Sequence, residues 1–297
     1  MPTNHTFAKL CARLNRAPVW VIAFVLAVGC CIAEETAPIQ RDAHVTSNLF
    51  VSADTNRPPI WFPVGEQLSY CVYWSGIPVG EIQATSSWVV VQGRPLLALT
   101  CRARSNRVLR WVYPVEDKVV TTVEPIGFLP VSFQVDFHEG RHIRHELTTF
   151  DYVAGKAVWT ATNNSKTRMF IIDPDVRDLL SFMYFMRKSD IHSESKLNLR
   201  VLLDGKIRQL PVTIGAHEKV KVSNYGSVDC LRVTPTLDFG KNNSSTNKMI
   251  VWLSTDVRHI CTRVKGFIAI GSITVELIDV SEPGAAHWPT NIMNPEE

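Results

Sequence analysis

The sequence lacks the short motifs that mark many catalytic and nucleotide-binding sites. It contains no G-x-S-x-G nucleophile elbow, no phosphate-binding loop and no dinucleotide fingerprint. Its seven cysteines nowhere form a C-x-x-C pair, which excludes the usual spacing of thiol-redox and zinc sites. No established catalytic class is therefore indicated by a local motif, and we expect no cofactor and no metal.

Beyond its N-terminal stretch the chain also lacks an excess of positive or negative charge. Lys9, Arg13 and Arg16 are the only Lys, Arg, Asp or Glu residues among the first 33, and beyond them 28 Lys and Arg face 28 Asp and Glu. A surface that follows nucleic-acid phosphates needs clustered cations, so we expect no nucleic-acid partner. With 297 residues, 45% of them apolar, the chain is long enough to bury a sizeable globular core.

Long hydrophobic runs are almost absent. The one uninterrupted run, Val19 to Val28, has ten residues and follows the three N-terminal cations. It is much shorter than the roughly 20 residues that span a bilayer as a helix. A positive flank followed by a short apolar run is typical of a secretory signal peptide, which we predict for residues 1–33. The protein is then exported, to the periplasm or the outer membrane of a bacterium.

Two cleavage sites fit this N-terminal stretch. Ala27-Val28-Gly29-Cys30 resembles the lipobox of lipoproteins, in which Cys30 would be acylated, although alanine stands where leucine is usual. Cleavage after Ala33 would instead release a soluble periplasmic protein. Membrane contact is expected only through such a lipid anchor. Residues 34–59, which are polar and rich in Thr, Ser, Asn and Pro, predict a flexible tether, and residues 282–297 a C-terminal tail.

Alternating short segments dominate the chain between residues 60 and 281, predicted as a single β domain. Leu68, Tyr70, Val72 and Trp74 lie on one face of the first segment, a period of two that predicts a half-buried strand. Similar segments recur up to Ile278, separated by glycine- and proline-containing turns, without alternating helices. The pattern predicts a mainly β fold, an antiparallel curled sheet that forms a barrel or half-barrel.

One helix interrupts the strands, predicted at about residues 174–188. Asp173 is suited to cap it and Pro174 to occupy its first position. Because apolar residues cover most of its faces, the helix is expected to be buried against the concave side of the sheet. It either fills that space as core or lines an apolar ligand cavity with Phe182, Met183 and Phe185, side chains that accommodate irregular guests.

The segment His138-Glu139-Gly140-Arg141-His142 matches H-E-x-x-H, but in the wrong context. That motif binds zinc from a helix, whereas the flanking residues alternate as strands do and predict a hairpin with Glu139-Gly140 as its turn and solvated histidines. An envelope hydrolase or metalloenzyme that uses His138, Glu139, His142 and His145 is nevertheless the alternative function to consider.

Two further groups leave more than one interpretation open. Four arginines precede Trp111 and Tyr113, and this segment either binds an anionic lipid head group or acidic polysaccharide or is a solvated strand and loop. The four arginines are Arg102, Arg104, Arg107 and Arg110. After the signal peptide four cysteines remain, as disulfides or as isolated thiols. They are Cys71, Cys101, Cys230 and Cys261.

Several short motifs, taken in order, resemble the bacterial domain-of-unknown-function family 3108. They are Trp61-Phe62-Pro63-Val64-Gly65-Glu66 before the Tyr70 strand, Gly80-Glu81, Arg104-Ser105-Asn106 before Trp111-Val112-Tyr113, Asp173-Pro174, Ile250 to Asp256, and Gly271-Ser272. The resemblance covers residues 59–280 and implies an exported, mainly β envelope protein without established catalytic activity. We expect a non-catalytic protein that binds an apolar or lipid-like ligand or an envelope partner, with Trp111 and Tyr113 as further ligand-binding candidates.

Overall fold

The structure, a computed structural model, describes residues 57–161, 166–188, 196–203, 205–236, 249–268, 271–282 and 288. The predicted signal peptide with Cys30, nearly all of the predicted tether and most of the predicted C-terminal tail lie outside these residues. Among the described residues, none belongs to a helix with the length and hydropathy needed to cross a bilayer.

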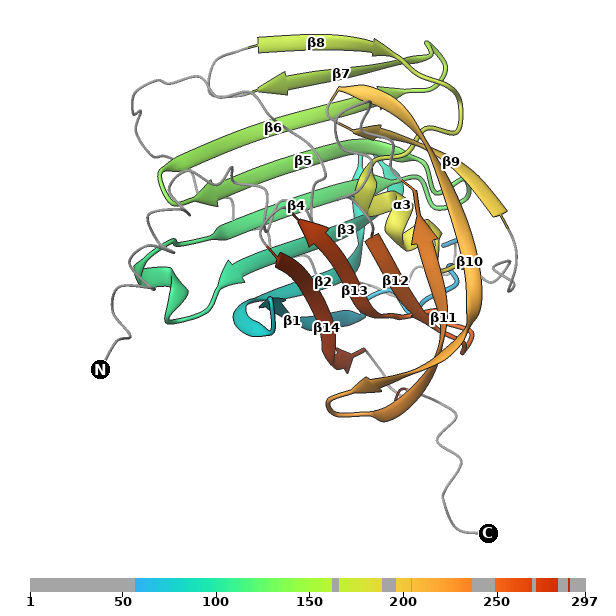
Figure 1. The fold of residues 1–297 in the computed structure, drawn as a ribbon. Coiled ribbons are helices and arrows are strands. Elements are labelled where there is room, and N and C mark those ends of the chain that lie inside the picture. Colours follow the sequence, from blue (N-terminus) through green and yellow to red (C-terminus); the bar gives the residue numbers. More distant parts are fainter. Residues whose placement is uncertain are drawn as a thin grey trace.

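Most of the described residues belong to one antiparallel sheet of 14 strands (Figure 1). The strands of its first half are β1 (Gln67–Trp74), β2 (Ile77–Val91), β3 (Arg94–Ser105), β4 (Glu116–Val123), β5 (Pro130–Glu139), β6 (His142–Asp151), β7 (Lys156–Ala161) and β8 (Lys166–Ile171). Those of its second half are β9 (Lys196–Leu203), β10 (Lys206–Val222), β11 (Gly226–Pro235), β12 (Met249–Ser254), β13 (Cys261–Ile268) and β14 (Gly271–Ser281). The predicted mainly β fold is confirmed.

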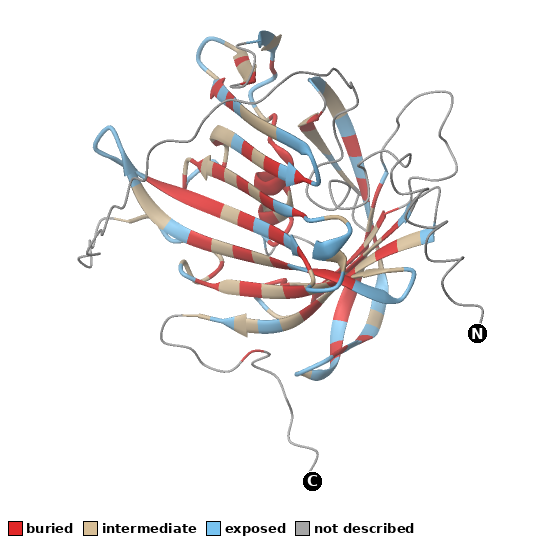
Figure 2. Cartoon of the chain, turned by 90° about the vertical axis from the view of Figure 1, so that its left-hand side faces the viewer, coloured by how far each residue is buried: buried red, intermediate tan, exposed pale blue. Residues whose placement is uncertain are grey.

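The strand order follows the chain in each half, and the first and last strands join the halves. It runs β8-β7-β6-β5-β4-β3-β2-β1-β14-β13-β12-β11-β10-β9, so β1 pairs with β2 on one side and β14 on the other. Buried and exposed residues alternate along most strands, as Figure 2 shows. Because alternate side chains point to opposite faces, the buried set from both halves meets on the concave side of the curled sheet and forms one main core.

The sheet does not close by pairing β8 with β9. Instead the segment after β8 adds to the edge of β9, where the Arg177 N–H donates to the Arg200 carbonyl at 3.0 Å and the Leu202 N–H donates to the Arg177 carbonyl at 2.8 Å. A small second core seals this region, formed by Phe150, Ala157, Ile172 and Val176 with Phe170, Leu202 and Ile207 packed against it. The curled sheet is thus a barrel completed by side chains and one short bridge.

The helix α3 (Leu179–Phe185) lies on the concave side of the sheet (Figure 1), as predicted, but it is shorter than the predicted helix. Arg177 pairs with Val201 of β9 and the helix begins only at Leu179, so Asp173 is not its cap. Asp178 has extended backbone angles, and its Oδ1 accepts hydrogen bonds from the Leu180 N–H at 2.8 Å and the Ser181 N–H at 3.0 Å. This is the arrangement of an N-cap residue.

Candidate ligand cavity

A cavity of about 80 Å³ lies between α3 and the concave face of the sheet. Strands β1 to β4 supply one wall, β13 and β14 supply another, and α3 with the residues after it covers both. The lining residues are Leu68, Tyr70, Ile82, Ala84, Cys101, Val119, Leu179, Leu180, Met183, Tyr184, Arg187, Cys261, Val264 and Val275. The first four and the last two strands of the sequence therefore form this largely apolar site together.

Small side chains explain why space remains beneath the helix. Ala84 of β2 lies opposite Cys101 of β3, and Cys101 in turn lies opposite Val119 of β4. Directly opposed residues of neighbouring strands share one face of the sheet, so these three side chains form a shallow row. Larger residues at these positions would fill the space, and Met183 faces the row from α3. The cavity volume therefore depends on the strand register, which places these small side chains next to one another beneath α3.

The polar groups of the cavity wall are almost all unable to ionise. Burial raises the pKa of the Tyr184 phenol and that of the Tyr70 phenol well above the ordinary value of a tyrosine. Burial also raises the pKa of the Cys101 and Cys261 thiols to about 12, so both stay protonated. A protonated thiol is a poor nucleophile. All four cysteines of the described chain are free thiols. The Tyr184 hydroxyl has no hydrogen-bond partner among the described residues.

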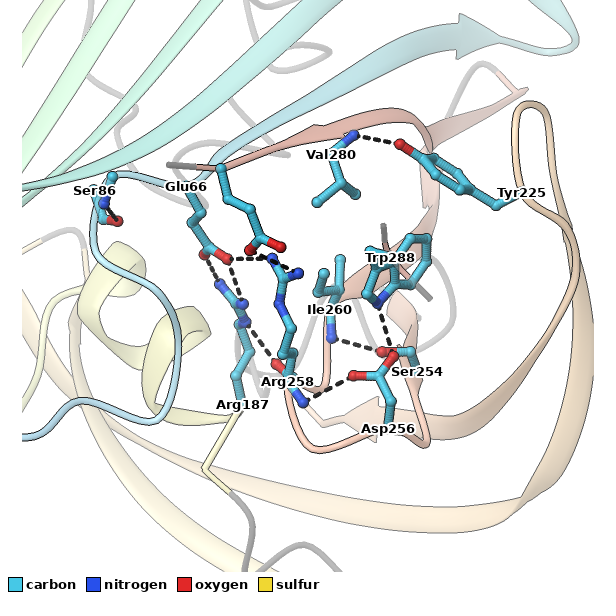
Figure 3. Close-up of polar contacts among 12 residues, drawn as sticks. Glu66, Ser86, Arg187, Tyr225, Ser254, Asp256, Arg258, Ile260, Val280 and Trp288 are labelled. Atoms are coloured by element: carbon cyan, nitrogen blue, oxygen red, sulfur yellow. Dashed lines mark hydrogen bonds and ion pairs between the residues drawn. The ribbon is translucent and has the colours of Figure 1, made fainter. Parts of the chain in front are cut away.

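The one charged residue of the wall, Arg187, belongs to a buried ion network (Figure 3). Its guanidinium donates to both carboxylate oxygens of Glu66, and the bond to Oε2 is 3.0 Å long. The Arg187 Nε also donates to the Arg258 carbonyl at 3.1 Å. Arg258 donates to the same Glu66 carboxylate at 3.2 Å and pairs with Glu282 at 2.8 Å. Two acids thus balance two bases, and Arg187 is not available to a ligand anion.

The electrostatics of this network explain how Arg187 stays charged inside the protein. Burial acts to lower the pKa of Arg187, but the Glu66 charge and hydrogen bonds outweigh it, and the pKa is raised overall. Glu66 is fully buried, with 0% exposure. The network joins the start of β1, the end of α3, the β12–β13 loop and the end of β14, and closes one side of the core.

Trp288, the last described residue, lies beside this network and is held there by two contacts (Figure 3). The Trp288 indole N–H donates to Asp256 Oδ2 at 2.7 Å, and its ring packs edge-on against Tyr225 with centroids 4.9 Å apart. The Tyr225 hydroxyl accepts a hydrogen bond from the Val280 N–H at 2.8 Å. Trp288 is buried and joins the main core, so part of the predicted tail is a structural element.

The predicted ligand-binding residues fall in three different places. Met183 lines the cavity, whereas Phe182 is buried in the core and Phe185 packs against the Arg177 guanidinium at 3.8 Å, and neither is part of the cavity wall. Trp111 is 91% exposed, and Tyr113 packs where a side chain at Gly140 would lie. A role of Phe182, Phe185, Trp111 or Tyr113 in ligand binding remains a prediction without support from the cavity.

The H-E-x-x-H segment forms the predicted hairpin between β5 and β6, with its turn one residue later than expected. Glu139 pairs with His142, so Gly140 and Arg141 make the turn, and Gly140 has a φ of +60°. His142 shares a face with Glu139, whereas His145, whose Nδ1 is 2.8 Å from Asp136 Oδ1, lies on the opposite face. The described residues hold no group of three His, Cys, Asp or Glu side chains placed for a metal ion.

Glu139 itself is buried, although the sequence predicted it as a turn residue of a polar hairpin tip. Only 3% of it is exposed, because it points to the concave face and the loop before β4 covers it, with the Gly140 N–H donating to the Pro114 carbonyl at 2.7 Å. Its neighbour is the equally buried Asp117, whose Oδ1 accepts from the His138 N–H at 3.0 Å. Sequence reasoning missed this carboxyl pair.

The pair titrates at unusually high pH. Burial raises the pKa of Asp117 to about 6. Burial, together with the Asp117 charge, raises the pKa of Glu139 to about 8. Asp117 Oδ2 and Glu139 Oε1 have no hydrogen-bond donor among the described groups. Because the two carboxyls are within hydrogen-bonding reach of each other, a proton held on Glu139 and donated to Asp117 would satisfy the pair. At neutral pH the pair therefore carries about one proton.

Replacing Glu139 by Gln tests this protonation. Folded Glu139 keeps its proton up to about pH 8, whereas an unfolded glutamate loses it near ~4.3, so the wild type loses stability as pH rises between these values. We expect Glu139→Gln to be about 1–2 kcal/mol more stable than wild type at pH 9 and nearly equal at pH 5. Urea unfolding of both proteins at pH 5 and at pH 9 measures the difference in their free energies of unfolding. The exposed Glu116→Gln is the control, and identical pH slopes for Glu139→Gln and wild type would contradict the assignment.

A family model and solved structures show what this chain is similar to. A family model described as "Protein of unknown function (DUF3108)" matches residues 69–278. The chain is similar to the solved beta-barrel-like protein of domain of unknown function DUF1849 from Brucella abortus, with 10% identity, 75% of this chain and 99% of that chain covered, and a TM-score of 0.52. A DUF1089 family protein from Pseudomonas aeruginosa gives 10% identity, 80% and 97% coverage and a TM-score of 0.26. No curated protein sequence matches the chain.

Proposed function

Because the chain belongs to the DUF3108 family of proteins of unknown function, as its motifs predicted, we propose a function from the cavity itself: the protein binds an apolar, lipid-like ligand without transforming it. The observation that carries the proposal is the composition of the cavity wall. Eleven of its 14 lining residues have aliphatic, methionine or cysteine side chains, and both phenols are neutral.

The cavity volume limits what can enter. About 80 Å³ is less than the ~150 Å³ of an engineered apolar cavity that holds a benzene ring. The end of an alkyl chain therefore fits, and a longer segment requires the cavity to widen. Met183 is the side chain best suited to move, because methionine is unbranched and adapts to irregular guests. The ligand class proposed is thus a molecule with at least one slender hydrocarbon chain.

The chemistry of the wall favours binding over catalysis. Both cavity thiols are protonated, and Arg187 is committed to Glu66. Asp117 and Glu139 are not among the lining residues. The alternative, an envelope hydrolase or metalloenzyme at the His138 segment, would need His142 and His145 to converge, and they lie on opposite faces of one strand.

The proposed location is the bacterial envelope. The N-terminal cations and the apolar run that follows them support export to the periplasm or outer membrane, with Cys30 as the lipidation site if the lipobox is used. An apolar ligand is consistent with this location, because envelope lipids need a protein cavity to leave the bilayer.

A series of straight-chain alcohols tests the binding proposal. We expect affinity, measured by calorimetry, to rise about fourfold for each added CH₂, which corresponds to ~0.8 kcal/mol, until the cavity is filled. Ala84→Val should weaken the longest bound member at least about tenfold, because the added methyl groups occupy the cavity. Ala98→Val is the matched control, since Ala98 is equally buried on neighbouring β3 but faces away from the cavity.

Two results would contradict the proposal. One is the absence of any dependence of affinity on chain length. The other is equal binding by Ala84→Val and wild type, which would place the bound alcohol elsewhere on the protein.

A further inference from the structure

The loop between β3 and β4 presents apolar side chains to solvent. It contains the short 3-10 helix η1 (Leu109–Trp111), and Val108 is 73% exposed, Trp111 91% and Val112 50%. Leu109, in the same loop, packs against the main core. The loop is therefore anchored from within by one apolar residue while three others point outward.

Its backbone is held by internal hydrogen bonds. Asn106 Oδ1 accepts from the Val108 N–H at 3.1 Å and from the Leu109 N–H at 2.8 Å. The Arg110 N–H donates to the Asn106 carbonyl at 2.9 Å, and the Val112 N–H donates to the Leu109 carbonyl at 2.9 Å. Because these donors are satisfied, the loop can enter an apolar medium without exposing them there.

The neighbouring turn extends the same surface. Asn106 Nδ2 donates to the Pro78 carbonyl at 2.6 Å, and the Asn106 N–H donates to the Val79 carbonyl at 2.9 Å. This contact places the loop beside the start of β2, where Ile77 is 60% exposed. Exposed apolar residues of two connections thus lie at one end of the sheet.

Two arginines lie in the loop itself, and the nearest acid is Glu116 at the start of β4. Arg107 makes no ion pair with any residue that the structure describes, and Arg110 is 4.0 Å from Glu116, with both side chains more than two-thirds exposed. Exposed pairs of this kind contribute little and leave the cation available. The apolar residues are therefore flanked by two arginines whose long side chains reach past the loop.

We propose that the loop of residues 106–113 docks the protein on an anionic lipid surface. Trp111, Val108 and Val112 enter the interface between head groups and acyl chains, where tryptophan is favoured, and Arg107 and Arg110 contact the lipid phosphates. Three protruding side chains are too small a patch for a stable protein interface, whereas they suffice for insertion between lipids. The proposal goes beyond ligand binding, because it concerns the surface on which the protein works.

Vesicle co-sedimentation with the full chain tests the proposal. Vesicles of phosphatidylglycerol mixed with phosphatidylcholine are compared with pure phosphatidylcholine. We expect Val108→Ser/Trp111→Ser to bind the anionic vesicles at least about tenfold more weakly, and Arg107→Gln/Arg110→Gln to lose about fivefold per arginine at low salt. Ile126→Ser/Val153→Ser is the matched control, because both residues are highly exposed in turns at the opposite end of the strands.

A second measurement is local to the loop. All variants share the apolar, basic N-terminal stretch, so total binding alone does not identify the inserting segment. Trp111→Phe keeps an aromatic side chain and should still bind, but quenching of tryptophan fluorescence by brominated phosphatidylglycerol should fall markedly relative to wild type. Unchanged quenching in Trp111→Phe, or equal binding by the Val108→Ser/Trp111→Ser variant and its control, would overturn the proposal.

Discussion

Replacing Glu66 by Gln is expected to lower the free energy of unfolding by about 3–5 kcal/mol. The substitution removes the charge that Arg187 and Arg258 share, and leaves two cations in a region where Glu66 has 0% exposure. Glu282 contacts only Arg258 among these residues, so it cannot compensate Arg187. Urea unfolding monitored by circular dichroism at pH 7 measures the change.

The control for Glu66 is an exposed pair on the same sheet. Glu81 accepts from Arg104 at 3.1 Å, but both side chains are about 60% exposed. We expect Glu81→Gln to change the free energy of unfolding by less than about 1 kcal/mol. If Glu66→Gln unfolds within about 1 kcal/mol of wild type, the buried network does not stabilise the fold in the way the geometry indicates.

Replacing Asp178 by Ala is expected to lower the free energy of unfolding by about 2–4 kcal/mol. Its carboxylate caps α3 and also accepts from the Ser181 hydroxyl at 2.7 Å and the Thr121 hydroxyl at 2.9 Å. Truncation removes the acceptor of the Thr121 hydroxyl and of the Leu180 and Ser181 N–H groups in a region where Asp178 is 1% exposed. The Ser181 hydroxyl keeps its second acceptor, the Asp178 carbonyl, at 3.1 Å. Thermal and urea unfolding of the variant measure the loss.

Asp173, the cap that the sequence predicted, supplies the contrast. It pairs with Arg200 at 2.9 Å on the surface, where its side chain is 49% exposed. Asp173→Ala should therefore lower the free energy of unfolding by less than about 1 kcal/mol. Equal losses for Asp173→Ala and Asp178→Ala would contradict the assignment of Asp178 as the cap of α3.

The difference between these two aspartates shows that local sequence rules cannot predict where this helix begins. Asp173-Pro174 is a good helix start by itself, and the rules that identify it consider only nearby residues. In the fold, Arg177 pairs with Val201 of β9, which lies more than 20 residues later in the chain, and the helix begins only after this bridge. The strands were predictable because period-two alternation is local, whereas the start of the helix depended on a distant partner.

The cavity was only partly predictable for the same reason. A buried helix with methionine suggested an apolar site, and Met183 does line it. Ala84 and Cys101 are ordinary small residues of strands, and their importance arises from the register that places them opposite one another. Tyr184 carried a usable signal, because a hydroxyl on a helix predicted to be buried must find a partner or face a cavity.

The carboxyl pair was missed because Asp117 and Glu139 are distant in sequence. Glu139 attracted attention as part of H-E-x-x-H, but alternation along β5 places it on the concave face, away from His138 and His145. Asp117 reaches the same region from β4. No sequence rule pairs the two carboxyls, since their proximity follows from strand register and from the loop that covers them.

The most direct test of the central claim is native mass spectrometry of the full chain, purified gently from its source and recorded before and after organic extraction. The cavity account predicts a co-purifying mass with a hydrocarbon chain that is lost on extraction and is absent, or much reduced, in Ala84→Val. A bare polypeptide in every preparation, which also fails to bind the straight-chain alcohols, would contradict an apolar ligand in this cavity.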